Sequence, residues 1–191
     1  MLREAFFRTD PLTCAENLIG AEFVWGKCAG IVVETEAYLV EGDEACHTFK
    51  RPSARAYIER NKPGAAYVYF NYGVHWMFNV LVKGGPRDGL VLIRALEPRQ
   101  GLALMRRRRG LEEVKRLCSG PGKLTQALSI NQRHHEMDLC SDPAHSFHAR
   151  SEEVEVVADP RIGISRAKDF PWRFTLRESV FVSVPVKRSR R

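Results

Sequence analysis

Residues 31–49, IVVETEAYLVEGDEACHTF, combine the apolar pattern of a buried β-strand with acidic side chains that such strands usually exclude. Side chains alternate along a strand, so two faces are predicted: Ile31, Val33, Thr35 and Ala37 on one, Val32, Glu34, Glu36 and Tyr38 on the other. The first face is expected to pack in the core. The second, which carries both glutamates, is predicted to form the wall of a wet site. A half-exposed strand with polar residues facing solvent would account for the same pattern.

The composition around this stretch is that of a globular chain. Hydrophobic residues make up 44% and charged residues 28% of 191 residues, which favours one domain spanning residues 1–191. No apolar run is long enough to span a bilayer, and the start, MLREAFFRTD, has no signal-peptide core. The five cysteines are scattered without a C-x-x-C pair, which favours free thiols in a reducing cytoplasm over a disulfide framework or a thiolate zinc site.

The remaining periodicity predicts strands at both ends of the chain and helices in the middle. A first helix is expected after Pro11, with Thr13 as N-cap, and further helices over about 99–117 and 123–130. The strands are predicted at 21–25, 30–39, 66–82 as a hairpin that turns at 71–73, 90–96, 153–158, 174–177 and 180–184. This order indicates an α+β fold, a single domain with a mixed, mainly antiparallel curved β-sheet core and surrounding helices.

The charge points to a polyanionic partner. Thirty Lys and Arg against 23 Asp and Glu give a formal net charge of +7, concentrated in Arg106–Arg109 and in the basic tail at about 187–191. Nucleic acid is the first partner that such an excess indicates, and an anionic membrane surface the second. A solvated helix face and a solubilising tail explain the same residues equally well.

Individual residues leave both functional and structural interpretations open. Tyr72, at the predicted hairpin tip, is either folded onto the surface or aimed at a partner, and an exposed ring there has the shape of a wedge that enters stacked bases. Arg94, inside the apolar run LVLIRALEP, needs an acidic partner or a bound anion. Residues 119–123, SGPGK, form either a phosphate site at a helix start or an ordinary glycine-rich connection, and do not match a P-loop.

The histidines near residue 140 do not indicate a metal site. Their spacing fits no common zinc pattern, and a polar segment of this kind is expected to be a solvated loop. The residues concerned are His134, His135, His145 and His148, with Glu136 and Asp138.

Five motifs in order carry a resemblance to a known family. They are VETEAY with DEACH (33–47), KPGAAYVYFNYG (62–73), FNV (78–80), LIRALEP (92–98) and LCSGPGKLTQAL (117–128). Over about residues 4–185 the chain resembles the alkyladenine (3-methyladenine) DNA glycosylases of the mammalian type. It lacks the long N-terminal extension of the mammalian enzymes, which indicates a compact bacterial form.

The resemblance implies a role for each matching residue. Glu36, the second glutamate of VETEAY, would activate the water that attacks the sugar C1′, with Arg94 beside it. Glu34 would be a supporting acid. Three side chains would hold the flipped base by stacking and hydrogen bonding: Tyr38, His47 and Tyr69. Asn79 would discourage guanine by crowding its exocyclic amine.

The resemblance also implies contacts with DNA. Tyr72 would fill the hole that the flipped base leaves, and Lys123 would lie close to the backbone. Residues 53–56, SARA, replace the TPRN-like segment usual in the family, so Arg55 is the remaining candidate there for a phosphate contact.

The implied activity is that of a monofunctional glycosylase without lyase activity. It would flip alkylated or deaminated purines out of double-stranded DNA and hydrolyse the N-glycosidic bond, with 3-methyladenine, 7-methylguanine, hypoxanthine and ethenoadenine as the substrate class. No metal, nucleotide or other cofactor and no membrane would be needed. The protein would act as a monomer in the bacterial cytoplasm, at the nucleoid. Two other hypotheses are a non-catalytic nucleic-acid-binding domain of the same fold, holding DNA through Arg55, Lys123 and the basic tail, and a hydrolase of small nucleosides.

Overall fold

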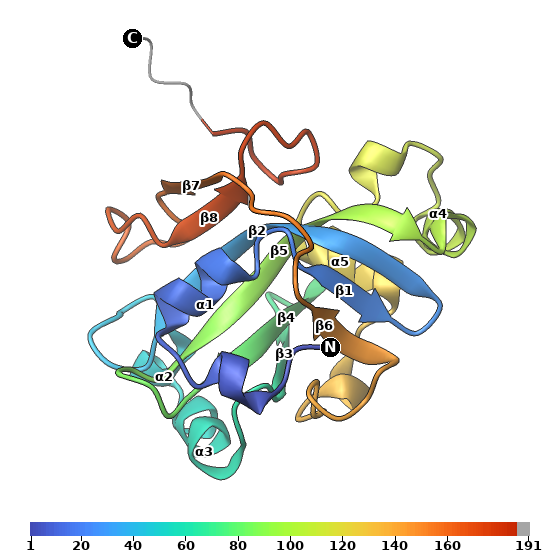
Figure 1. The fold of residues 1–191 in the computed structure, drawn as a ribbon. Coiled ribbons are helices and arrows are strands. Elements are labelled where there is room, and N and C mark those ends of the chain that lie inside the picture. The colour runs from blue at the N-terminus through green and yellow to red at the C-terminus, as the bar shows by residue number, and fades with distance from the viewer. Residues whose placement is uncertain (187–191) are drawn as a thin grey trace, which may run out of the picture.

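Eight β-strands form one curled sheet in the computed structural model, which describes residues 1–186 (Figure 1). The sheet order is β3-β4-β5-β2-β1-β6, with β8 also paired to β2 and β7 to β8, and every described pair is antiparallel. The strands are β1 (Glu22–Trp25), β2 (Cys28–Leu39), β3 (Ala66–Asn71), β4 (His75–Val82), β5 (Gly89–Gln100), β6 (His145–His148), β7 (Val156–Asp159) and β8 (Arg173–Leu176). The predicted α+β fold is confirmed.

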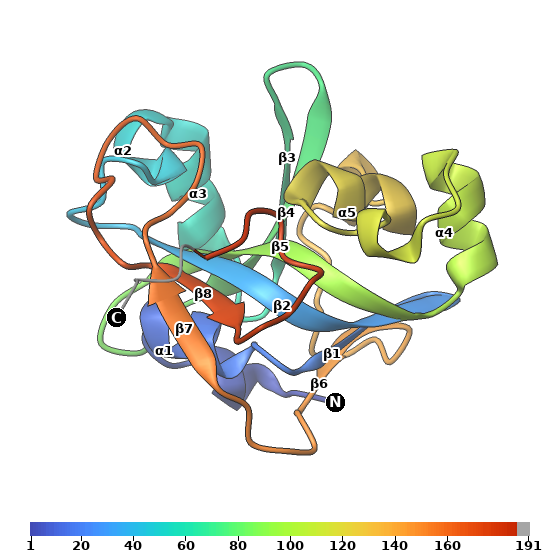
Figure 2. The same cartoon turned by 90° about the horizontal axis from the view of Figure 1, so that it is seen from above.

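The helices pack on both sides of this sheet. The α-helices are α1 (Pro11–Asn17), α2 (His47–Lys50), α3 (Pro52–Arg60), α4 (Leu102–Arg109) and α5 (Pro121–Leu128), with 3-10 turns at Glu4–Phe7, Val114–Arg116 and Gln132–His134. Figures 1 and 2 show α1 and α5 on opposite sides of β2 and β5, and buried residues of both helices belong to the main hydrophobic core. Within residues 1–186, no helix has the length and apolarity needed to cross a bilayer.

Strand β2 changes partner halfway along one edge. Its first half pairs with β1 and its second half with β8, while β5 pairs along the whole opposite edge. The register shifts around Val33 and Glu34, as in a β-bulge, and such a shift breaks simple alternation. The predicted faces are therefore partly wrong, because Val32 packs in the core, Ile31 is half-buried, and both glutamates are fully buried.

The predicted hairpin is confirmed as β3–β4. The amide of Val74 donates to the Asn71 carbonyl (3.0 Å), and Tyr72 and Gly73 between them both have positive φ, at 50° and 69°. Two consecutive residues of this kind match the right-handed twist of the strands that they join. Figure 2 shows the hairpin protruding beyond α5 and α2, so its tip stands clear of the molecule.

Helices α2 and α3 were not predicted. Pro52 begins α3, at a position where its missing N–H is not needed. Tyr57 and Ile58 of α3 pack with Tyr67 and Leu81 of the hairpin in a second hydrophobic cluster. This packing fixes α2, just before α3, beside β3.

Four other element predictions are wrong. Helix α4 covers only Leu102–Arg109 of the predicted 99–117, because β5 continues to Gln100 and Gly110 ends the helix in a left-handed conformation. The N-cap of α1 is Asp10, which accepts from the Leu12 amide (2.9 Å), because Pro11 takes the first helical position and moves the start upstream of Thr13. Residues 145–148 form β6 because the apolar Phe147 packs in the core beside β1, instead of lying in a loop. Residues 180–184 form no strand, because the Ser183 amide bonds to a buried side chain instead of a neighbouring strand.

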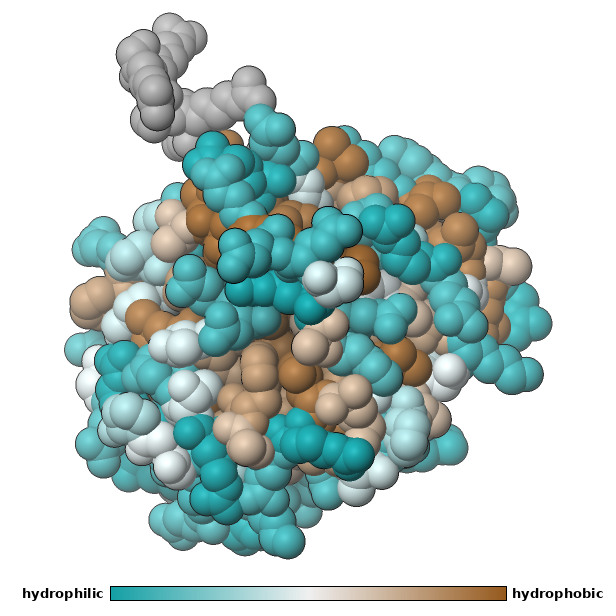
Figure 3. Space-filling model, viewed as in Figure 1, coloured by the Kyte–Doolittle hydropathy of each residue, from teal (hydrophilic) through white to brown (hydrophobic). Residues whose placement is uncertain are grey.

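Much of the arginine run on α4 serves packing. Arg108 donates to the Ala127 carbonyl (2.9 Å) and Arg109 to the side chain of Gln126, so both tie α4 to α5. The basic tail at 187–191 lies outside the described residues. On the face seen in Figure 3, hydrophobic side chains lie in small groups among hydrophilic ones, as is usual for a surface in water.

Candidate active site

A cavity of about 370 Å³ opens between α2, the β3–β4 hairpin, β5 and residues 162–166 of the loop after β7. This volume is typical of small-ligand sites. The predicted site residues that line it are Tyr38, His47, Tyr69, Tyr72, Asn79 and Arg94. The fold therefore brings together residues from four strands, one helix and the hairpin turn.

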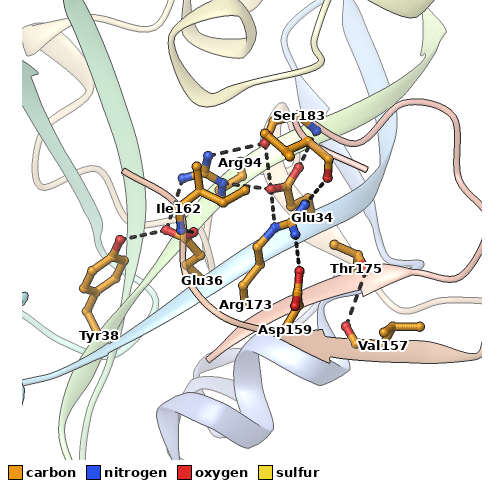
Figure 4. A network of polar contacts seen from close by, with 11 residues as sticks. Glu34, Glu36, Tyr38, Arg94, Val157, Asp159, Ile162, Arg173, Thr175 and Ser183 are labelled. Atoms are coloured by element: carbon orange, nitrogen blue, oxygen red, sulfur yellow. Dashed lines mark hydrogen bonds and ion pairs between the residues drawn. The ribbon is translucent and has the colours of Figure 1, made fainter. Parts of the chain in front are cut away.

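Glu36 lies behind this cavity and has no exposed surface. One oxygen, Oε2, accepts from the Tyr38 hydroxyl (2.7 Å) and from Arg94 (3.1 Å), and Oε1 accepts from the Ile162 amide (2.7 Å; Figure 4). The prediction that this strand face is itself the wet wall is corrected: Glu36 has no exposed surface, and its carboxylate bonds to three residues that line the cavity, Tyr38, Arg94 and Ile162.

Arg94 is buried between two glutamates. Its Nε donates to Glu34 (2.9 Å) and one terminal nitrogen to Glu36, which is the acidic partner that an arginine in an apolar strand requires. Burial lowers the pKa of Arg94, but Glu36 and Glu34 outweigh it and raise that pKa above the usual value. Burial likewise raises the pKa of Glu34, and Arg94 and then Arg173 outweigh it and hold that pKa below its usual value. Arg94 and Glu34 therefore form a charged pair.

A second arginine, Arg161, holds the outer side of Tyr38. Its guanidinium donates twice to Asp43 (2.6 and 2.8 Å) and lies over the rings of Tyr38 (4.6 Å to the centroid) and Trp172 (4.9 Å). Sequence reasoning missed Arg161, because 118 residues separate it from Asp43. It also missed Arg173, which directly precedes the predicted strand at 174–177, whereas Arg94 lies inside the predicted strand at 90–96.

Aromatic rings form one wall of the cavity. The His47 ring lies edge-on to Tyr69 (4.1 Å between centroids), and His47 Nδ1 lies 3.3 Å from the Tyr67 hydroxyl. Burial, with a smaller effect of Arg51, lowers the pKa of His47 to about 4, so the imidazole is neutral at pH 7. Asn79 donates to the Tyr67 carbonyl (3.2 Å), which fixes its amide against the same wall. The part of the wall formed by His47, Tyr67 and Tyr69 is therefore electron-rich, and none of these three side chains carries a positive charge.

Tyr72 stands at the hairpin tip with 91% of its surface exposed. Its φ of 50° is a conformation that a bulky residue rarely adopts. Strained backbone with an exposed ring is typical of functional positions.

The two other predicted DNA contacts lie outside the cavity lining. Arg55 donates to the carbonyls of Thr48 (2.6 Å) and Phe49 (3.3 Å), and so closes the end of α2. Lys123 is exposed in the first turn of α5, with Nζ 3.5 Å from Ser119 Oγ. Sequence reasoning missed three cations that line the cavity, namely Lys50, Arg51 and Arg166.

The histidines considered as metal ligands have other surroundings. His134 and His145 lie edge-on to Trp25, and His145 Nδ1 lies 2.6 Å from Asp142. His135 stacks on Tyr57. Across residues 1–186, no three His, Cys, Asp or Glu side chains are grouped so that they could hold a metal ion.

This arrangement suits a flat, cationic ring. Electron-rich rings attract such a group, and the cations around the cavity suit an anionic backbone outside it. The buried carboxylate can stabilise positive charge or take a proton from water, and both effects are strong at low dielectric.

Comparison with known proteins shows which family the chain belongs to. The model of the methylpurine-DNA glycosylase family matches residues 5–180. A relative from Rhodopseudomonas palustris (strain CGA009), named "Putative 3-methyladenine DNA glycosylase", is 46% identical over 188 residues, 98% of this chain and 90% of the relative. Relatives of the same name from Bradyrhizobium diazoefficiens (44% identical; 96% and 91% covered) and Agrobacterium fabrum (46%; 94% and 91%) match similarly.

Proposed function

Because the chain belongs to the methylpurine-DNA glycosylase family and is a DNA glycosylase, we propose that it excises alkylated and deaminated purines from duplex DNA. The substrate class is 3-methyladenine, 7-methylguanine, hypoxanthine and ethenoadenine. The observation that carries the proposal is the ring-lined cavity with the carboxylate of Glu36 bonded to Arg94 at its wall.

Base recognition follows from the wall of rings. The flipped base enters between Tyr38, His47 and Tyr69, where a purine that carries positive charge from alkylation is held by electron-rich faces. Because His47 is neutral, it does not repel the positive charge of the alkylated purine. Asn79 lies against this space with its amide fixed, and it disfavours guanine by crowding the exocyclic amine.

Hydrolysis follows from the carboxylate. As the bond between base and sugar breaks, its electron pair leaves with the purine, which departs neutral if it was cationic and takes up a proton from solvent if it was neutral. Positive charge develops on the sugar, and Glu36 stabilises it while it takes a proton from the attacking water. Arg94 and the Tyr38 hydroxyl hold Glu36 in position. Water is the nucleophile, so no lysine Schiff base forms and no strand cleavage accompanies excision. The protein acts as a monomer, without a cofactor, on the DNA of the bacterial cytoplasm.

The experiment is an excision assay on duplex oligonucleotides that contain ethenoadenine or hypoxanthine, and on alkylated genomic DNA. Alkali should break the oligonucleotides at the lesion only after incubation with the protein, and chromatography should detect free 3-methyladenine and 7-methylguanine from genomic DNA. Borohydride should trap no covalent adduct. Folded protein that releases no base from any of these substrates would leave DNA binding without catalysis as its function.

A further inference from the structure

The segment 181–184 reaches the active-site charges from outside the region that the family model matches, which ends at residue 180. Its Ser183 amide donates to Glu34 Oε2 (2.5 Å) and its hydroxyl to Glu34 Oε1 (2.7 Å). The next residue, Val184, accepts through its carbonyl from Arg173. Arg173 in turn donates to Glu34 Oε1 (2.8 Å; Figure 4). Ser183 and Val184 therefore both bond to one buried cluster of charged side chains, Glu34 with Arg173.

The Ser183 hydroxyl closes a ring of hydrogen bonds around Arg94. It accepts from the terminal nitrogen Nη2 of Arg94 (3.3 Å) while it donates to the same Glu34 oxygen that accepts from Arg94 Nε. A hydroxyl can do both at once, because it has one proton and two lone pairs. With Nε and Nη2 both held, the plane of the guanidinium is fixed and Nη1 points at Glu36.

We propose that Ser183 is a positioning residue that orients Arg94 toward Glu36 through Glu34. This inference rests on the proposed role of Glu36 in base excision. Ser183 touches neither the cavity nor Glu36, so it acts only through Arg94. Its loss should slow the chemical step and leave recognition of the base unchanged, since the ring wall is formed by other elements.

The test compares three serine variants with the wild-type protein. Ser183→Ala removes only the hydroxyl and leaves the amide bond to Glu34. Ser183→Thr keeps a hydroxyl. Ser179→Ala is the matched control, because the Ser179 hydroxyl accepts from the Phe181 amide (3.3 Å) within the same segment. Circular dichroism establishes that each variant is folded.

We expect Ser183→Ala to lower the single-turnover excision rate by about ten-fold, since it removes a hydrogen bond to a charged group. Its Kd for lesion DNA should stay unchanged, Ser183→Thr should restore the rate, and Ser179→Ala should not lower it. A fall in affinity instead of rate, equal effects of the two alanine variants, or no rescue by threonine would each overturn the proposal.

A second measurement does not depend on activity. Hydrogen exchange of the Arg94 Nε proton, followed by NMR, should be about ten-fold faster in Ser183→Ala than in the wild-type protein or in Ser183→Thr. Unchanged exchange would overturn the positioning role. Should the wild-type protein release no base, the proposed function fails, and the exchange rates still decide whether Ser183 holds Arg94.

Discussion

At the scale of single residues, Glu36 is held by three donors and has no water-facing surface. Glutamine in its place turns one acceptor oxygen into an NH₂ group that faces a donor, and this mismatch should cost about 1–3 kcal/mol of stability. We expect Glu36→Gln to remain folded, to bind lesion DNA, and to lose excision by a factor of about 10²–10⁴. Single-turnover kinetics and binding by fluorescence anisotropy measure the two effects.

Glu44→Gln provides the control for that prediction. Glu44 also carries a carboxylate and lines the cavity, but it is exposed and pairs with Arg166 (2.8 Å). Its loss should change the excision rate by less than about three-fold, because exposed ion pairs contribute little. Equal losses in the two variants would move the catalytic role away from Glu36.

His47 makes the stability of the protein depend on pH. Its pKa is about 4 in the folded state and 6.5 in the unfolded chain, so between these values the unfolded state binds a proton that the folded state does not. Stability should therefore be complete above pH 6.5 and fall as the pH drops toward 4. Urea unfolding should show that the wild-type protein loses about 1–2 kcal/mol more than His47→Gln between about pH 7 and pH 5. Parallel losses in the two proteins would contradict the buried, neutral imidazole.

At the scale of elements, the β3–β4 hairpin holds a strained residue at its tip. Asparagine tolerates positive φ better than tyrosine does, so Tyr72→Asn should raise stability by about 0.5–1 kcal/mol. The same change removes the ring that is proposed to fill the duplex, and excision from duplex DNA should fall at least about ten-fold. Thermal unfolding and the excision assay measure the two effects.

Tyr72→Phe separates the effect of backbone strain on stability from the effect of the aromatic ring on excision. It keeps an aromatic side chain at φ 50°, so it should preserve both the lower stability and the activity of the wild-type protein. Full activity in Tyr72→Asn would exclude the ring from any role on DNA.

At the scale of the whole molecule, the net charge of +7 should produce salt-dependent DNA binding. Lys123→Ala should weaken binding to lesion and undamaged duplex alike and reduce the slope of log Kd against log salt by about one. Lys27→Ala, at another exposed lysine, in the β1–β2 turn outside the cavity, should leave the slope unchanged. Identical slopes for the two variants would remove Lys123 from the DNA contact.

Much of the sheet could be predicted from the sequence because its signals are local. The hairpin follows from aromatic and β-branched residues on either side of Asn71–Gly73, and β2 and β5 follow from long apolar runs. The short strand β6 and the helices α2 and α3 were missed, because their sequences are polar and they are held by packing on β1 and on the hairpin. Residues 180–184 show the opposite error, since they are rich in β-branched residues like a strand, but the Ser183 amide bonds to the carboxylate of Glu34.

The α+β architecture, the hairpin turn at 71–73 and a set of candidate site residues could be predicted from the chain alone, because strand period, turn residues and motif order are local features of a sequence. The folded structure was needed to find that Glu36 is fully buried, that Glu34 bonds to Ser183 at a separation of 149 residues, and that Arg161 lies over the ring of Tyr38. Contacts of this kind form when distant segments meet in a low-dielectric interior, and no local period of the sequence indicates which segments will meet.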